Sequence, residues 1–461
     1  MRQRIGRGRP SLVHPVGSAR RTNRYLVVWG AVVTLVLSGC GSEPLRELFG
    51  DDTPHQRYAL RLAEAELDGT ALGRDWIAAA ESALEKPVTV AAPYREESYL
   101  DPREAMAVAY RIPLRNGQRL EVAFESAPDS GYRVFLDLFR APRDSAATPR
   151  RVLSADSLER SLEYLARRDG EYLVRIQPEL LRGGRYTITI VVEPSLQFPV
   201  SGYDTSAIRS RYGAPRDGGR RRHEGLDIFA RRGTPVLAAA SGYVRSTRPN
   251  NLGGNVIWLR DEMERTHYYA HLDSVVVFRG LAVEVGDTIG FVGNSGNART
   301  TPPHLHFGVY QRGSFDPYPA LYQVPTTPEA FSGNPDLIGR VARVSRERTR
   351  VREAPSGGSD VVAELARHTP VRVAAGSGPW YRVMLPDGTT GYVATGLTEP
   401  LDGPIGRQTV VAGTDLLTEP DPAAVAVDRF VMGTELDVLG VFGSFVFVQN
   451  SSGRLGWVSL D

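Results

Sequence analysis

The stretch Pro303-His304-Leu305-His306-Phe307-Gly308-Val309 fixes the fold of this chain more narrowly than any other segment. Its histidines alternate with apolar residues, and a period of two is typical of a β-strand with one face in a core. A proline can open such a strand without loss of a ladder hydrogen bond. The pattern therefore predicts a strand with His304 and His306 on one face and Leu305, Phe307 and Val309 on the other.

Two further histidine packets lie upstream, His223-Glu-Gly-Leu-Asp227 and His267-Tyr-Tyr-Ala-His271. Five of the chain's eight histidines thus fall between His223 and His306. Imidazoles alongside a carboxylate are the ligand set that zinc prefers, so the clustering indicates a catalytic zinc site. Alternation within the second packet predicts that His267, Tyr269 and His271 share one face of a strand.

The first packet must bend to act as a metal site. In a fully extended strand His223 and Asp227 would lie about 13 Å apart, too far to share an ion with bonds of about 2 Å. Gly225 supplies the freedom to bend. The glycine and the aspartate at the fifth position argue against a helical His-Glu-x-x-His motif, so Glu224 is not assigned as a general base. We expect a loop that runs into a buried strand.

Across roughly residues 208–310 the sequence resembles the lysostaphin-type, or LytM-like, zinc endopeptidases. The resemblance rests on the three packets and on the motifs between them, which are Arg211-Tyr-Gly213, Arg232-Gly-Thr-Pro235-Val, Gly254-Asn255-Val256, Tyr269-Ala-His271-Leu272, Val285-Gly-Asp-Thr-Ile-Gly290 and Gly293-Asn-Ser-Gly296. Two departures are the segment Ala298-Arg-Thr-Thr-Pro-Pro303 and His267, where the family usually has a small polar residue. They bear on substrate preference rather than on metal binding.

The resemblance implies that His223, Asp227 and His306 bind Zn²⁺ and leave the fourth position to water. It implies that His271 and His304 are the catalytic pair, without deciding which of the two is the general base. No other cofactor is expected. The implied substrate is a peptide cross-link or stem peptide of peptidoglycan. For His267, a strand residue near the cleft without ligand duty is the favoured interpretation.

The N-terminus has the layout of an export signal. Seven arginines precede an apolar run from Tyr25 to Leu37, which is too short to span a bilayer, and no acidic residue comes before Glu43. The run ends in Leu37-Ser38-Gly39-Cys40, which resembles the lipobox of bacterial lipoproteins. The resemblance implies a signal peptide over residues 1–39 and lipidation of Cys40, the only cysteine. The alternative is a plain signal or anchor helix with an incidental cysteine.

An exported, membrane-anchored lipoprotein of the bacterial cell envelope, facing the periplasm, is the localisation that follows. Gly41-Ser42 after the cysteine lacks the aspartate associated with inner-membrane retention, which weakly favours the outer membrane. The net charge of +2 supplies no global field that would attract nucleic acid, so no nucleic-acid partner is expected.

The predicted fold class is mainly β and multi-domain. Thr53-Pro54-His55-Gln56 has the form of a capping box and predicts a helix to about Leu67, followed by a second helix. Alternating apolar residues then predict an accessory β-sandwich. The predicted parts are a linker (40–52), a helical pair (53–87), the sandwich (88–196), a β-rich peptidase domain (199–322), a linker (323–338) and two SH3-like modules (339–400 and 405–461).

The C-terminal part contains an internal duplication with a constant offset of 65 residues. Thr369 matches Thr434, and Gly391-Tyr-Val393 matches Gly456-Trp-Val458. The two copies resemble bacterial SH3-like modules, which implies cell-wall binding. The alternative is that they only pack against the rest of the protein, with the aromatic residues Trp380, Tyr381 and Trp457 in their cores.

The leading prediction is a membrane-tethered zinc endopeptidase that trims peptidoglycan. One alternative is a non-catalytic LytM-like regulator that activates separate cell-wall amidases, which would then be partners. Another is a lipoprotein that mainly binds the wall. Retention of all five motif residues argues against the regulator, because a degenerate site has no chemical reason to keep them.

Overall fold

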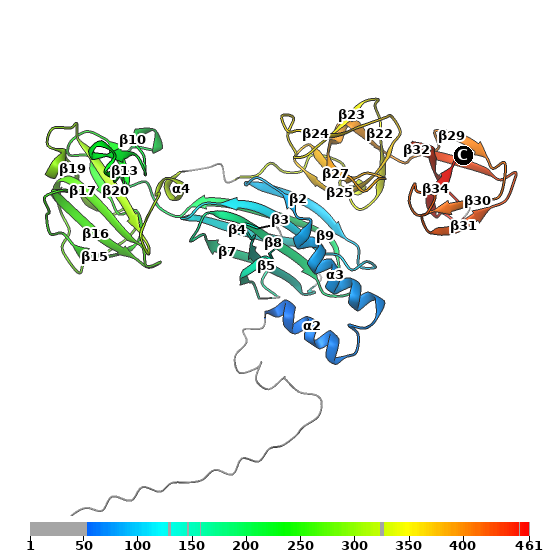
Figure 1. The fold of residues 1–461 in the computed structure, drawn as a ribbon, viewed down its shortest axis with the longest axis horizontal. Helices are drawn as coiled ribbons and strands as arrows, with labels where there is room; N and C mark the ends of the chain where they lie inside the picture. The colour runs from blue at the N-terminus through cyan, green and yellow to red at the C-terminus, as the bar shows by residue number, and fades with distance from the viewer. Residues whose placement is uncertain are drawn as a thin grey trace, which may run out of the picture. The chain divides into compact units, whose positions relative to one another are not determined.

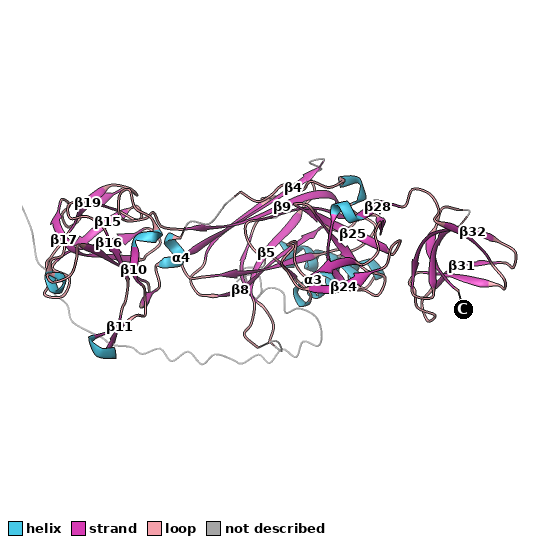
Figure 2. Cartoon of the chain, turned by 90° about the horizontal axis from the view of Figure 1, so that it is seen from above, coloured by secondary structure: helices cyan, strands magenta, loops and turns pink. Residues whose placement is uncertain are grey.

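The computed structural model describes residues 53–127, 131–144, 147–156, 158–322, 327–450 and 452–460. Strands dominate these residues, which confirms the mainly β, multi-domain prediction (Figures 1 and 2). The predicted signal peptide, Cys40 and the linker up to residue 52 lie outside the described residues. Within the described ranges, no helix has the length and apolar character needed to cross a membrane.

The predicted helical pair consists of α2 (Pro54–Glu64) and α3 (Ala71–Glu85). The capping box is present, because the Thr53 hydroxyl accepts from the Gln56 N–H and the Gln56 side chain accepts from the Thr53 N–H. Helix α2 ends three residues before the predicted position. The reason is that Glu66 adopts a left-handed φ of 57°, which turns the chain out of the helix.

The helical pair packs on the accessory sandwich through aromatic side chains. Trp76 of α3 is almost fully buried, and its indole N–H donates to the carbonyl oxygen of Pro178 at 2.9 Å. The His55 ring stacks on Trp76 at 4.7 Å, and Phe135 meets Trp76 edge-on. His55 is therefore a packing residue of the helix–sheet contact.

The accessory domain is the predicted β-sandwich. Its two sheets are antiparallel except for the parallel pair of β1 with β3. They enclose one core, to which both contribute large residues such as Tyr110, Leu136, Phe124 and Ile188. The first sheet contains β1 (Val88–Thr89), β3 (Val108–Leu114), β8 (Gly170–Pro178), β5 (Val134–Arg140) and β6 (Arg150–Ser154), and the second contains β2 (Tyr94–Leu100), β9 (Gly184–Pro194), β4 (Gln118–Ala127) and β7 (Ser161–Leu165).

The second sheet of the sandwich continues into the first SH3-like module. Strand β2 pairs with β25 (Pro370–Ser377) of that module, with Glu97 opposite Gly376. Beneath the junction, Glu96 is fully buried and accepts two hydrogen bonds from Arg382, at 2.9 and 3.0 Å. A buried, bidentate ion pair of this kind is costly to break, so the sandwich and the first module are joined.

The two SH3-like modules repeat the same six strands with the offset of 65 residues. Tyr381 is buried in the core of the first module, and Trp457 is buried in a separate cluster with Leu417 and Phe447. Trp380 is half-buried, so packing accounts for these aromatic residues. The first module contains β22 (Val341–Val344), β23 (Thr349–Arg352), β24 (Val361–Leu365), β25, β26 (Trp380–Met384), β27 (Thr390–Ala394) and β28 (Thr398–Pro400), and the second contains β29 (Gly406–Thr409), β30 (Thr414–Leu417), β31 (Ala426–Phe430), β32 (Glu435–Phe442), β33 (Phe445–Gln449) and β34 (Leu455–Ser459).

The histidine packets lie on a separate antiparallel sheet with its own core (green in Figure 1). The path of this sheet is β10 (Ile208–Ser210), β13 (Leu226–Phe229), β20 (His304–Tyr310), β17 (Thr266–Val275), β16 (Asn255–Asp261), β15 (Gly242–Ser246) and β18 (Ala282–Val283). Strand β14 (Pro235–Leu237) pairs with β19 (Thr288–Val292), which also pairs with β17, and β21 (Ser314–Phe315) pairs with β20. Next to the site are the hairpin β11 (Pro215–Arg216) and β12 (Arg221–Arg222), the short helix α4 (Tyr318–Leu321) and the turn Gly296–Ala298.

Candidate metal centre

The strand predicted from the His-x-His motif is β20, and its two faces divide as the alternation predicts. Leu305, Phe307 and Val309 are fully buried in the core, whereas His304 and His306 are on the opposite face. Strand β13 pairs antiparallel with β20 and sets Asp227 directly opposite His306. The pairing brings together two residues that are 79 positions apart in the sequence.

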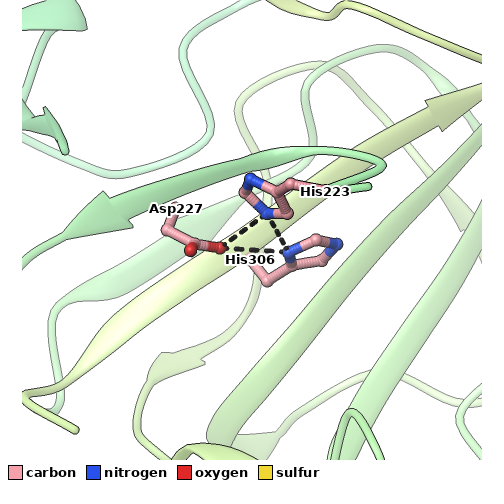
Figure 3. Close-up of side chains that lie close together, drawn as sticks. All are labelled: His223, Asp227 and His306. Carbon is pink, nitrogen blue, oxygen red and sulfur yellow. Dashed lines mark hydrogen bonds and ion pairs between the residues drawn. The ribbon is translucent and has the colours of Figure 1, made fainter. Parts of the chain in front are cut away.

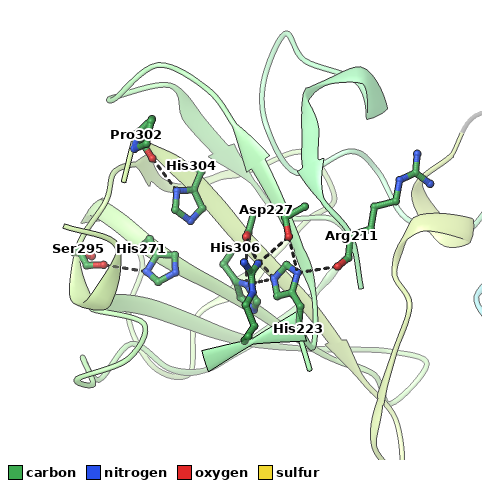
Figure 4. Close-up of polar contacts among 10 residues, drawn as sticks. Arg211, His223, Asp227, His271, Ser295, Pro302, His304 and His306 are labelled. Atoms are coloured by element: carbon green, nitrogen blue, oxygen red, sulfur yellow. Dashed lines mark hydrogen bonds and ion pairs between the residues drawn. The ribbon is translucent and has the colours of Figure 1, made fainter. Parts of the chain in front are cut away.

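His223 reaches the same place from the loop before β13. Gly225 permits the approach because a side chain there would collide, its Cβ lying only 2.5 Å from the Phe307 carbonyl oxygen and 2.9 Å from the His306 ring. The expected bend therefore occurs, and Gly225 is required for close contact with β20. The His223 Nδ1–H donates to the carbonyl oxygen of Arg211 at 3.0 Å, which turns Nε2 toward the site (Figure 4).

The three predicted metal ligands form a compact triangle (Figure 3). His223 Nε2 lies 2.9 Å from His306 Nδ1 and 3.0 Å from Asp227 Oδ1, and His306 Nδ1 lies 3.1 Å from Asp227 Oδ1. Ligand atoms around one tetrahedral zinc ion with bonds of about 2.0–2.2 Å are separated by about 3.3–3.6 Å. The triangle is close to this arrangement and needs only a small expansion to fit it.

The chemistry of the three atoms also fits a cation. His223 Nε2 carries a lone pair, because its Nδ1 holds the proton that binds Arg211, and Asp227 Oδ1 is an acceptor. Burial would raise the pKa of Asp227, but its close polar contacts with His223 and His306 outweigh burial and lower that pKa, so this carboxyl is ionised. His223 and Asp227 are almost fully buried, and His306 is half-buried. Two imidazoles and one carboxylate form the donor set of a zinc site with an open fourth position.

The predicted catalytic pair lies beside this triangle. The rings of His271 and His304 are 5.0 Å apart, and that of His271 is 6.0 Å from His306. The Nδ1 atom of His304 bonds the Pro302 carbonyl oxygen at 2.8 Å, and that of His271 bonds the Ser295 carbonyl oxygen at 2.9 Å (Figure 4). These carbonyl acceptors place the ring protons on Nδ1 and leave an unprotonated Nε2 on each ring.

His271 lies on a different face of β17 from the one that the sequence pattern predicts. The predicted common face of His267, Tyr269 and His271 is wrong: His267 and Tyr269 are fully buried, whereas His271 lines the cleft with Tyr268 and Ala270. The reason is an irregularity in the pairing of β16 with β17 together with a left-handed φ of 62° at His271. The backbone turn moves His271 to the other face, and such strained residues concentrate at functional sites.

The environment of His271 keeps its imidazole neutral. Burial is the main cause, followed by the neighbouring His304, and together they lower the pKa of His271 to about 4. Burial likewise lowers the pKa of His306, against the opposing effect of Asp227. Both imidazoles are therefore neutral at neutral pH and keep one nitrogen lone pair, as a metal ligand or a proton acceptor must.

His267 has no place in the site. Its Nε2 bonds Asp261 Oδ2 at 2.9 Å inside the core, and burial lowers its pKa. Arg265 holds the same carboxylate through its backbone N–H and its Nε, at 2.7 and 2.6 Å. His267 is thus a structural residue of a buried network, more deeply enclosed than the expected position near the cleft.

The site opens into a cleft of about 640 Å³. Its lining includes Tyr268, Tyr310 and Arg209, to which the sequence gives no role, and also Arg216 and Arg222, the ends of a loop that the sequence allows to cover the cleft. Arg216 contacts the Asp227 carboxylate directly, with Nη2 at 2.5 Å from Asp227 Oδ2. The arginines between Arg216 and Arg222 are the feature of the sequence that could have indicated this side of the cleft. Their position over the site depends on the folding of the β11–β12 hairpin.

Comparison with known families gives two matches. Residues 221–317 match peptidase family M23, and residues 347–399 match the bacterial SH3 domain. The chain carries an M23 peptidase domain. The match spans all five residues of the predicted site, from His223 to His306, and the second match falls on the first SH3-like module.

Curated relatives resemble the M23 domain in sequence. The L-Ala–D-Glu endopeptidase of Bacillus subtilis (strain 168) is 42% identical over 137 residues, covering 27% of this chain and 42% of that protein. The peptidoglycan DD-endopeptidase ShyC of Vibrio cholerae is 38% identical over 91 residues, covering 20% of this chain and 21% of that protein. The chain therefore spans less than half of the length of each relative.

Solved structures that are similar to part of this chain include the catalytic domain of lysostaphin from Staphylococcus simulans. It is 34% identical to this chain, and the alignment covers 24% of this chain and 89% of that domain with a TM-score of 0.23.

Proposed function

We propose that this protein is a zinc-dependent endopeptidase that hydrolyses peptide bonds of peptidoglycan. The observation that carries the proposal is the triangle of His223, Asp227 and His306 beside the His271–His304 pair in one cleft. The M23 match supports it, as do the two relatives, which are an L-Ala–D-Glu endopeptidase and a peptidoglycan DD-endopeptidase. A cross-link or stem peptide is the proposed substrate.

In the proposed mechanism, the zinc ion when bound acidifies a water molecule and polarises the scissile carbonyl group. The protein's own groups prepare this chemistry. Arg211 fixes the His223 ring through its carbonyl oxygen, and Pro302 and Ser295 do the same for His304 and His271. Each member of the pair presents an unprotonated Nε2, the atom that accepts a proton from water or holds a hydrogen bond to the reacting group.

We further propose that the mature protein begins at a lipidated Cys40 and is anchored to a membrane of the bacterial envelope, facing the periplasm. The sandwich and the two SH3-like modules then determine how far the M23 domain reaches and how the protein meets the wall. Labelling of growing cells with a clickable fatty acid tests the anchor. The wild type should incorporate the label, and a Cys40→Ser variant should not; equal labelling of both would contradict it.

Digestion of purified peptidoglycan tests the proposed activity. The chain from Gly41 onward, supplied with zinc, should release new peptide ends detectable by mass spectrometry. The His304→Ala variant should bind zinc and release almost none. Zinc binding by the wild type without any cleavage would favour the regulator that activates amidases, and undiminished cleavage by His304→Ala would contradict the role of that residue.

A further inference from the structure

One side of the metal cleft is rich in arginine. Arg209, Arg216, Arg221 and Arg222 all line it, whereas Glu224 is the only acidic lining residue apart from the ligand Asp227. Like charges gathered at a partly enclosed site repel one another and focus a positive potential into the cleft. Repulsion among these arginines lowers the stability of the folded state. The arrangement therefore indicates that the cleft binds an anionic ligand.

Arg209 is aimed by an irregularity of the sheet. In the pairing of β10 with β13, Ile208 lies opposite Ile228 and Ser210 lies opposite Asp227, which leaves Arg209 as an extra residue between them. A bulge of this kind re-aims one side chain and is common next to active sites. Arg209 is exposed and lines the cleft. It is adjacent in sequence to Ser210, the residue that pairs with Asp227.

Arg222 is carried by the β11–β12 hairpin, which is fastened to the site at two points. Behind the hairpin, the backbone N–H of His223 donates to Ala214 at 2.8 Å. In front of it, Arg216 Nη2 bonds both the Ser210 hydroxyl at 2.8 Å and the outer oxygen of Asp227. Arg222 directly precedes His223 in the sequence. These contacts place Arg222 at the rim of the cleft, with an exposed side chain.

Arg216 differs from Arg209 and Arg222 in its hydrogen-bond partners. Arg216 is already satisfied by Asp227 and Ser210. For Arg209 and Arg222, the part of the chain that the structure describes offers no side-chain hydrogen bond or ion pair. Guanidinium groups bind carboxylates through paired, charge-assisted hydrogen bonds, which makes a peptide carboxylate a matching ligand.

We propose that Arg209 and Arg222 bind a free carboxylate of the substrate peptide close to the scissile bond, so that the cleft selects acidic over amidated peptides. This inference rests on the proposed endopeptidase function and names its substrate class. Arg216 is a positioning residue that holds the hairpin against Asp227. The expected preference is about 10- to 100-fold in kcat/KM, which corresponds to about 1.4–2.7 kcal/mol, the size of a charge-assisted hydrogen bond.

A matched pair of substrates tests the proposal. Two synthetic stem peptides carry the bond that the enzyme cleaves and differ only in a carboxylate or a carboxamide next to that bond. The zinc-loaded chain from Gly41 onward should cleave the acidic peptide with a kcat/KM about 10- to 100-fold higher. The Arg209→Gln/Arg222→Gln double variant should cleave both with similar kcat/KM, while Arg279→Gln, an exposed arginine outside the cleft lining, should keep the wild-type preference.

Binding provides a readout that does not depend on catalysis. In calorimetry, zinc-loaded His304→Ala protein should bind the acidic peptide more tightly than the amide, and adding the two glutamines should remove the difference. Equal affinity of the single variant for both peptides, or a preference that survives the two glutamines, would overturn the proposal. If neither peptide is cleaved by the wild type but the acidic one binds more tightly, the endopeptidase function fails and the carboxylate site stands.

Discussion

His267 and His271 lie four residues apart on β17 and serve opposite purposes. His267 is fully buried in a network with Asp261, while His271 lines the metal cleft with a left-handed backbone. Both rings have a lowered pKa because of burial. The difference shows that neither residue type nor pKa distinguishes the histidine that lines the cleft. What marks it is a strained backbone that aims an unprotonated nitrogen at other histidines.

The same contrast holds for the two faces of β20. Its core face carries Leu305 and Phe307, which stabilise the sheet by burial, and its cleft face carries His304 and His306. Substitutions on the cleft face should therefore lower activity and leave the stability of the fold nearly unchanged. Substitutions on the core face should lower stability and leave activity nearly unchanged.

The largest expected effect comes from the ligands. Asp227→Ala should lower peptidoglycan cleavage by at least about 1,000-fold, because a site without its carboxylate no longer holds the ion that acidifies water. Release of peptide ends from purified wall measures the loss. His267→Leu provides the control from the core face of the same sheet, and comparable loss in both variants would break the distinction between the two faces.

The catalytic pair should follow with a different signature. His304→Ala and His271→Ala should each lower kcat by about 100- to 10,000-fold while zinc stays bound, since proton transfer rather than metal binding is lost. Steady-state kinetics alongside metal analysis separates the two causes. Loss of zinc from either variant would show that the residue belongs to the ligand set.

The pH dependence of stability should report on His271. Its pKa of about 4 lies below the value of 6.5 for an unfolded chain. Between pH 6.5 and pH 4 the unfolded state therefore binds a proton at His271 that the folded state does not bind. The metal-free wild type should lose up to about 3 kcal/mol of stability in this region as the pH falls from 6.5 to 4.

Hydrogen exchange of the segment Thr266–Val275 at several pH values measures that loss locally. A His271→Gln variant should show a flatter dependence than the wild type over the same range. An equally steep dependence in the variant would mean that other groups, such as His267, dominate the acid response of the strand.

The smallest effect is expected on the core face. His267→Leu should cost about 1–2 kcal/mol, because one hydrogen bond to Asp261 is lost while Arg265 keeps two, and because His267 Nδ1 has no hydrogen-bond partner among the described residues. Thermal unfolding measures the cost. Activity should remain within a few-fold of wild type, and a hundredfold loss would place His267 in the machinery.

Local patterns were enough to predict much of this fold. Alternation predicted β20 and its two faces, and the capping box predicted the start of α2. Each of these signals arises from neighbours in sequence, through side-chain periodicity or backbone capping.

The features that the sequence did not predict depend on distant contacts or on one backbone angle. The face of His271 follows from a φ of 62° within a strand, which no residue pattern announces. The continuous sheet between β2 and β25 depends on Glu96 and Arg382, which are 286 residues apart. The arginine side of the cleft depends on a bulge at Arg209 and on the folding of a short hairpin.

Zinc content is the most direct test of the central claim that His223, Asp227 and His306 hold one metal ion. Freshly purified protein from Gly41 onward should contain one zinc per chain by mass spectrometry of the metal. Asp227→Ala and His306→Ala should contain almost none, and His267→Leu should retain the full amount. An empty wild type under saturating zinc, or a full complement in the ligand variants, would contradict the account.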